Sequence, residues 1–206
     1  DGVLLRRPTL GEIRENLRLR AICLLLGVVF LIYLAHATFF YFMKDLALQT
    51  GGGDVGLFFT LSMAAMIAVR IFGTPLFDKM DKLTALQIGF ALLIPCFIVL
   101  PQAHGGLAFY LLAGVYGLSM GVSLPLLNAL IFLASPPLLR GLNTNLSLFA
   151  LDMAYFFMPY VGGALLAFGT GFDSLFYIAA GWTALALALC ALLARHLETV
   201  PKDHHL

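Results

Sequence analysis

The sequence predicts an all-helical membrane protein with six transmembrane helices, and three observations support this. Apolar residues make up 61% of the 206 residues and charged residues 11%, with a mean hydropathy of +0.97, whereas average chains have about 45–50% and 25%. Six apolar stretches can each cross a bilayer core of about 30 Å as a helix. Basic residues gather at alternate breaks between these stretches. The composition excludes a soluble enzyme and a disordered chain, and the net charge of +1 excludes a nucleic-acid-binding module.

Glycine, proline and charged residues separate the six predicted spans. The spans lie near Ala21–Met43, Val55–Phe77, Leu83–Leu100, Leu107–Ala134, Asn143–Phe168 and Phe172–Ala194. These runs lack the short length and alternating polarity of barrel strands, so we expect helices. We therefore expect residues 1–20 to be a polar linker with an amphipathic turn or two, residues 21–194 to be the transmembrane domain, and residues 195–206 to be a tail.

The distribution of basic residues predicts the orientation of the bundle. With the N-terminus in the cytoplasm, the outside loops hold only Lys44. The inside segments then hold ten basic residues, namely Arg6, Arg7, Arg14, Arg18, Arg20, Lys79, Lys82, Arg140, Arg195 and Lys202. Cytoplasmic loops carry an excess of lysine and arginine. We therefore expect both ends of the chain to be cytoplasmic.

Three cysteines, Cys23, Cys96 and Cys190, each lie in an apolar run without a CxxC partner or a nearby histidine. This pattern predicts no metal site and no disulfide framework, and we expect the thiols to pack as small apolar groups. Nothing in the sequence indicates a cofactor.

Arg70 and Asp152 are ionisable residues well inside predicted spans, where a charge is costly and commonly marks function or a pair. At 1.5 Å per residue, both lie about 5–6 Å to the cytoplasmic side of their span midpoints. One hypothesis is a coupled pair that breaks and reforms as the protein changes state. The alternatives are a static bridge, and charges that each face a partner outside this chain.

Polar stripes occupy three of the predicted helices. His36 shares a face with Tyr33 and Phe40, by their spacing of three and four residues. The other two stripes are Tyr116, Ser119 and Ser123, and Asn145, Asp152 and Tyr155. His36 is either a titrating or ligand-contacting residue, or is hydrogen-bonded to a neighbouring helix. The stripes either converge on a water-filled cavity or form interhelical hydrogen bonds.

Gly117–Gly121 fits the pattern GxSxG, in which Ser119 would be a nucleophile. A nucleophile elbow needs a strand-to-helix turn, whereas this segment lies within a predicted helix. His36 is the one candidate base within a span. We expect Gly117 and Gly121 to form a face for close helix packing, and an intramembrane serine hydrolase is a remote alternative.

Three segments combine spaced glycines and prolines with charges. They are Arg70–Lys82, with Gly73 ahead of Asp78, then Gly117–Pro125, and Arg140–Gly163, with Pro159 ahead of a glycine pair. Together they resemble the C-terminal six-helix half of the major facilitator superfamily of secondary transporters. The first segment departs from that family's loop motif, because Gly73 and Asp78 are five residues apart rather than four and Asp81 replaces the second glycine.

The resemblance implies a fold and candidate site residues. Superfamily members have two six-helix halves, each built from two inverted three-helix repeats, with the substrate between the halves near the midplane. The first and fourth helices of each half line the cavity, which makes Tyr33, His36, Phe40, Tyr41, Tyr116, Ser119 and Ser123 the substrate-cavity candidates. The second and fifth helices pack against the other half, so the coupling or gating candidates are Arg70, Asp152, Asp78 and Arg140.

The resemblance therefore implies the C-terminal half of a secondary transporter that moves a small solute by alternating access, in a bacterial inner membrane. Proton coupling through Asp152, or through His36, is a further hypothesis. Because the chain starts at Asp1 with an arginine-rich segment, we expect it to be a fragment or a split subunit. Its expected partners are the lipid bilayer and an N-terminal half or a second copy, without nucleic acid. A non-transporting assembly protein on the same fold is the alternative function.

Overall fold

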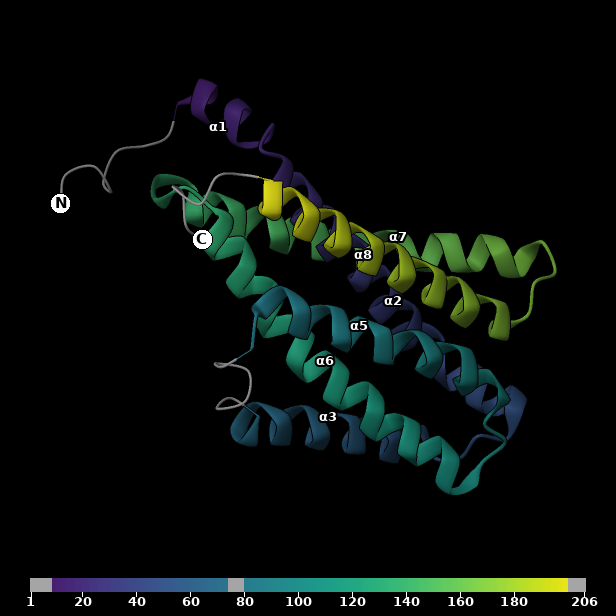
Figure 1. Cartoon of the computed structure of the whole chain (residues 1–206). Coiled ribbons are helices and arrows are strands. Elements are labelled where there is room, and N and C mark those ends of the chain that lie inside the picture. Colours follow the sequence, from purple (N-terminus) through teal and green to yellow (C-terminus); the bar gives the residue numbers. More distant parts are fainter. Residues whose placement is uncertain (1–8, 74–79, 200–206) are drawn as a thin grey trace.

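The computed structural model describes residues 9–73 and 80–199, with side chains up to residue 196. Within these ranges the chain forms seven α-helices, two 3-10 turns and no strand (Figure 1). The elements are α1 (Leu10–Asn16), α2 (Arg20–Thr50), α3 (Val55–Phe72), α5 (Lys82–Val99), η2 (Leu100–Gln102), α6 (Gly106–Ala134), η3 (Pro137–Leu139), α7 (Arg140–Ala167) and α8 (Phe172–Thr199). Six of the helices are long and apolar enough to cross a membrane. The predicted fold class is therefore confirmed.

Several helix ends differ from the predicted spans. The first spanning helix, α2, continues to Thr50 instead of stopping at Met43, because nothing interrupts the helix before Gly51, which adopts the left-handed conformation with φ of 68°. The next helix starts where the Asp54 carboxylate accepts a hydrogen bond from the backbone N–H of Leu57 at 3.0 Å. It ends at Phe72, before Gly73, and residues 74–77 of the predicted second span lie outside the described residues.

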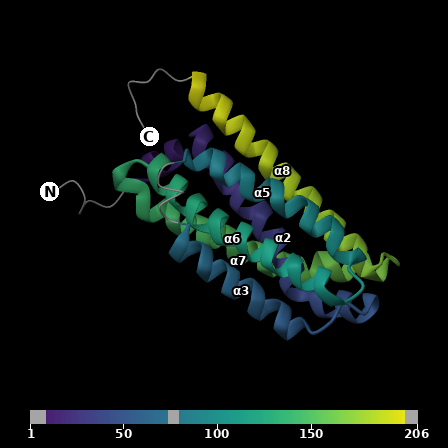
Figure 2. The ribbon, with the colours of Figure 1, turned by 60° about the horizontal axis from the view of Figure 1, so that its bottom comes forward.

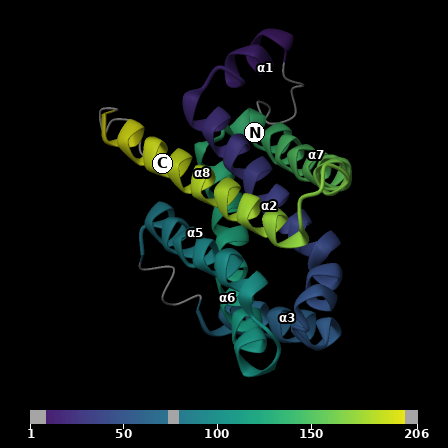
Figure 3. The same ribbon diagram turned by 90° about the vertical axis from the view of Figure 1, so that its right-hand side faces the viewer.

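The six spanning helices form an open arc. Along this arc α7 packs on α2, α2 on α8, α8 on α5, α5 on α6, and α6 on α3, while α2 and α6 also touch. Helices α5 and α8 run side by side on one side of the bundle (Figure 2). Viewed from the end, α7 and α3 lie at the two edges with α2 between them (Figure 3). The side of the bundle bordered by α3 and α7 is called the open face below.

The packing pattern repeats between two triplets of helices. The second helix of each triplet packs on the first helix of the other, as α3 does on α6 and α7 on α2. The third helices, α5 and α8, also pack on the first helix of the other triplet and on each other. Each triplet crosses the membrane three times, so the second triplet starts on the opposite side of the membrane from the first. The triplets α2–α3–α5 and α6–α7–α8 are therefore inverted repeats.

The edge helices contribute little to the core. Only 11% of the most apolar stretch of α3 and 17% of that of α7 is buried, against 56% for α2. The largest fully buried side chains come mainly from the other helices, and include Phe39, Phe90, Phe97, Tyr116 and Phe176. Helices α3 and α7 therefore leave much of their apolar surface uncovered within this chain.

Most described basic residues lie at one end of the bundle. This end carries α1, the end of α3, the start of α5, the connection from α6 to α7, and the end of α8 (Figure 1). Its basic residues are Arg14, Arg18, Arg20, Arg70, Lys82, Arg140 and Arg195. Lys44 lies near the far end of α2, toward the opposite end of the bundle. This end is called the basic end below.

Candidate functional site

The open face carries a group of aromatic side chains around His36, which we call the aromatic cluster. Its members are Tyr33, His36, Phe40 and Tyr41 from α2, Phe59 from α3, Tyr116 from α6 and Tyr155 from α7. The cluster thus contains residues from α2 and α6, which contact each other, and from the two edge helices α3 and α7. Phe40 and Tyr41 remain 57% and 40% exposed, so their rings are available for contact with another molecule.

His36 is the centre of the cluster. Its Nδ1 shares a hydrogen bond with the hydroxyl of Tyr116, whose ring lies parallel to the imidazole with a centroid distance of 6.0 Å. The rings of Tyr33 and Tyr155 approach His36 edge-on, at 6.3 and 6.1 Å. His36 is thus hydrogen-bonded to a neighbouring helix, and its role as a titrating or ligand-contacting residue stays a prediction.

The hydrogen bond ties α2 to α6 at the place where the two inverted repeats meet. Tyr116 is held on its other side by Phe39, which stacks on it at 3.9 Å. The imidazole is therefore placed by a buried phenol whose own position is fixed by packing.

Tyr155 joins the fifth span to this cluster. Its ring contacts Phe40 at 5.9 Å and Tyr41 at 6.0 Å, both at steep angles. Edge-to-face pairs of this kind stabilise by about 0.5–1.5 kcal/mol beyond the burial of their area. The predicted stripe of the fifth span thus meets the stripe of the first span through one tyrosine.

Arg70 and Asp152 border the cluster from opposite edge helices. Because α3 ends at Phe72, Arg70 lies in the last turn of this helix and not well inside a span as predicted. Arg70, exposed on α3, lies near enough to Tyr33 to interact with it electrostatically. Asp152 is exposed on α7, three residues before Tyr155. Among the residues that the structure describes, Asp152 forms no ion pair, so this state contains no Arg70–Asp152 bridge.

Ser119 and Ser123 do not join the cluster, although they share a spacing pattern with Tyr116. Both side chains are buried, and among the described residues neither hydroxyl has a hydrogen-bond partner. The Ser123 hydroxyl lies against Gly89 of α5, where an added Cβ would overlap it. At 100° and 1.5 Å per residue, Ser119 is rotated about 60° from Tyr116 around the helix, and Ser123 lies about 10 Å further along the helix than Tyr116, at nearly the same angle as that tyrosine.

Comparison with known protein families agrees with this architecture. The family model described as Major Facilitator Superfamily matches residues 22–205, which is most of the chain. The chain belongs to the major facilitator superfamily. No curated protein matches it closely enough to count as a relative. Membership makes it a multi-pass integral membrane protein with a transporter-type function.

Of the two remaining gating candidates, Arg140 lies at the basic end. Asp78 falls outside the described residues. Arg140 begins α7 and lies over the ring of Phe132 at 4.3 Å, a cation–π contact. Its Nε is buried and has no hydrogen-bond partner in the described part of the chain. Arg140 therefore lies away from the aromatic cluster in sequence and contacts, next to the connection between α6 and α7.

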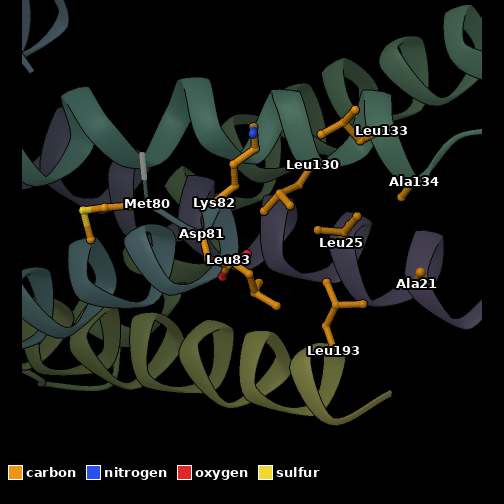
Figure 4. A pocket seen from close by; sticks show the side chains of 10 residues that line it. All are labelled: Ala21, Leu25, Met80, Asp81, Lys82, Leu83, Leu130, Leu133, Ala134 and Leu193. Carbon is orange, nitrogen blue, oxygen red and sulfur yellow. The ribbon is translucent and has the colours of Figure 1, made fainter. Parts of the chain in front are cut away.

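A cavity of about 200 Å³ lies at the basic end among α2, α5, α6 and α8 (Figure 4). Leu25, Leu83 and Leu193 converge on it. Of its charged residues, Asp81 already accepts a hydrogen bond from the backbone N–H of Thr84 at 2.8 Å, as the cap of α5. The cavity shares no residue with the aromatic cluster and is a separate feature of this superfamily member.

Two members of the cluster were not among the predicted cavity residues. Tyr155 was visible in the sequence as part of the fifth-span stripe, but its meeting with the first span depends on the packing of α7 on α2. Phe59 gave no signal, because a phenylalanine in an apolar span has the same pattern whether it faces lipid or a cavity.

Removing the Tyr116 hydroxyl should destabilise the bundle. In Tyr116→Phe the half-buried His36 loses its partner, and leaving a buried polar group unpaired costs about 1–3 kcal/mol. We expect a lower thermal unfolding temperature in detergent micelles. Tyr177→Phe is the matched control, because Tyr177 is 41% exposed, and it should leave the temperature unchanged. Equal unfolding temperatures for both variants would contradict the role assigned to the hydrogen bond.

Proposed function

We propose that this chain is the C-terminal half of a secondary transporter, which moves a small solute by alternating access. The observation that carries the proposal is the aromatic cluster on the open face. At its centre, His36 of α2 is hydrogen-bonded to Tyr116 of α6. Ligand sites are mostly apolar surfaces with a few placed polar groups. Tyr33, His36, Phe40 and Tyr41 provide such a surface, and the buried Tyr116 holds His36 in place. Arg70 and Asp152 are the nearby charges.

The uncovered surfaces of α3 and α7 support pairing with a second six-helix unit, either an N-terminal half or a second copy of this chain. Large apolar side chains are exposed on both helices, among them Ile67 and Ile71 on α3 and Phe156 and Tyr160 on α7. Lipid covers such surfaces as well as protein does, but it does not enclose an aqueous path. A second unit across the open face would close the path around the aromatic cluster.

The proposed orientation places the basic end in the cytoplasm of a bacterial cell, within the inner membrane. The described basic residues at that end support it, because cytoplasmic loops are enriched in lysine and arginine. Rocking of the second unit against this one would then open the aromatic cluster alternately to the two sides of the membrane.

The geometry gives little support to the hydrolase alternative. A serine nucleophile needs a base within hydrogen-bond reach, at about 2.6–3.2 Å. The Ser119 hydroxyl is buried without a partner among the described residues, whereas His36 is bonded to Tyr116. The same helix, α6, thus holds its serine toward α5 and its tyrosine toward the histidine.

Substituting Tyr155 tests the proposed solute site. Small aromatic and aliphatic solutes are first tested for uptake into vesicles that contain the full transporter, which identifies a transported solute. Tyr155→Ala should then lower the uptake of that solute roughly 2- to 10-fold, because one aromatic contact stabilises by about 0.5–1.5 kcal/mol. Tyr177→Ala is the control, because Tyr177 is an exposed tyrosine on α8, outside both the cluster and the two edge helices. Failure of the wild type to take up any solute would favour the assembly-protein alternative.

A further inference from the structure

A buried pair of asparagines joins α1 to the spanning bundle. Asn16 ends α1 and is 2% exposed, and Asn143 lies in the first turns of α7 and is fully buried. The Asn16 Nδ2 donates to the Asn143 Oδ1 at 2.6 Å, and the Asn143 Nδ2 donates to the Asn16 Oδ1 at 3.1 Å. The two amides therefore satisfy each other across 127 residues of sequence.

The pair continues into α6. The second hydrogen of the Asn143 Nδ2 is donated to the Ser135 Oγ at 2.7 Å, and this hydroxyl donates to the Ile131 carbonyl at 2.5 Å. Ser135 directly follows α6 and Asn143 follows η3, so the network spans the whole connection between the two helices. An asparagine amide has two donor hydrogens, and both of those of Asn143 are used. One short network thus links α1, α6 and α7 at the basic end.

The docking of α1 depends on this pair more than on apolar packing. Of the apolar side chains in and after α1, Leu10 is 86% exposed, Leu17 and Leu19 are 42% and 43% exposed, and Ile13 is partly buried, so none is fully buried. A capping box between Thr9 and Glu12 stabilises the start of the helix, but it lies within α1 itself. An element held by a few polar contacts near the membrane surface can separate and rehydrate, whereas one held by a large apolar core cannot.

A cavity of about 360 Å³ lies beside the pair, between α1 and the α6–α7 connection. Its lining includes Asn16, Glu15 and Leu19 on one side and Pro136 and Leu138 on the other. Because the two sides are already partly separated there, α1 can move away without first breaking a continuous packed interface.

We propose that Asn16 and Asn143 form a latch, which holds α1 on the α6–α7 connection in one state of the protein and opens when the basic end rearranges. The inference rests on the proposed alternating-access function, in which the two repeats move relative to the second half. The α6–α7 connection joins two helices of the second repeat that each pack on the first repeat. When α1 is fixed to this connection, it therefore favours one arrangement of the repeats over the other. A buried amide without a hydrogen-bond partner is costly. The two hydrogen bonds between the asparagines therefore break in one step, with no state in which only one of them is broken.

Hydrogen–deuterium exchange of the full chain in lipid nanodiscs tests the latch. Asn143→Ala should speed amide exchange across α1 by at least about tenfold and leave exchange in α5 and α8 unchanged. The matched control is Asn145→Ala, two residues further along the same helix at an exposed position. Unchanged exchange in α1, or a uniform increase over all helices, would overturn the latch.

A second variant protects the test against misfolding of α7. Asn16→Ala alters only α1, which lies outside the spanning helices, and should speed exchange at the start of α7. In a background without the native cysteines, the same substitution should also speed maleimide labelling of Ser147→Cys, a buried position one turn beyond Asn143. An unchanged labelling rate would mean that α1 does not control the basic end. Both readouts are independent of transport, so their failure is distinct from a failure to transport.

Discussion

Replacing Gly117 with alanine should weaken the contact between α3 and α6 and lower the free energy of unfolding by about 1–3 kcal/mol. A Cβ at this position would overlap the backbone carbonyl oxygen of Ser62 and lie 2.9 Å from the Cβ of Ala65. The obstacle on α3 is partly backbone, so no rotamer change relieves it and the helices must separate. Because α3 is buried mainly against α6, it has little other packing to retain its position.

Gly114 is a matched control for this prediction. It lies one turn earlier in α6, and a Cβ there would meet nothing within 4 Å. Alanine is favoured over glycine inside a helix by about 1 kcal/mol. Gly114→Ala should therefore raise the thermal unfolding temperature or leave it unchanged, whereas Gly117→Ala lowers it. If both substitutions raise the thermal unfolding temperature, the inferred close packing of α3 on α6 at Gly117 is contradicted.

The fold could be predicted from the sequence because its determinants are local. The length of each apolar run and the glycines and charges between them indicate the spans, and the spacing of Gly117 and Gly121 indicates a packed face. Their close contacts with Ser62 and Met66 on α3 confirm that face. Helix ends were less predictable, since Lys44 and Asp45 near the end of an apolar run do not stop a helix that continues to Gly51.

The candidate site was only partly predictable, because it depends on how helices rotate against one another. Periodicity places Tyr116, Ser119 and Ser123 on one broad side of a helix, but a neighbour covers one part of that side and leaves another open. Here α5 covers the two serines, while Tyr116 reaches His36. The Asn16–Asn143 pair was beyond reach for the same reason, since no local pattern connects residues 127 positions apart.

The carboxylate of Asp152 should determine whether transport responds to pH. A charge within a bilayer costs several kcal/mol unless it is neutralised by a proton, a counter-charge or water. Asp152 has no ion pair within the described residues and is exposed on α7, so within this chain a proton or water from the aqueous path must stabilise it. We expect a pH gradient to stimulate uptake by the wild type, and Asp152→Asn, which cannot titrate, to abolish that stimulation.

Two further variants separate coupling from other roles of this charge. His36→Gln removes the other intramembrane titrating candidate, and Asp45→Asn removes a carboxylate near the far end of α2; both should retain the response to the gradient. If Asp152 instead pairs with a cation of the second half, Asp152→Asn should weaken the association of the two units and leave the pH response in the remaining assemblies. Uptake at matched assembly, measured with and without a gradient, distinguishes these outcomes, and a retained response would rule out Asp152 as the coupling residue.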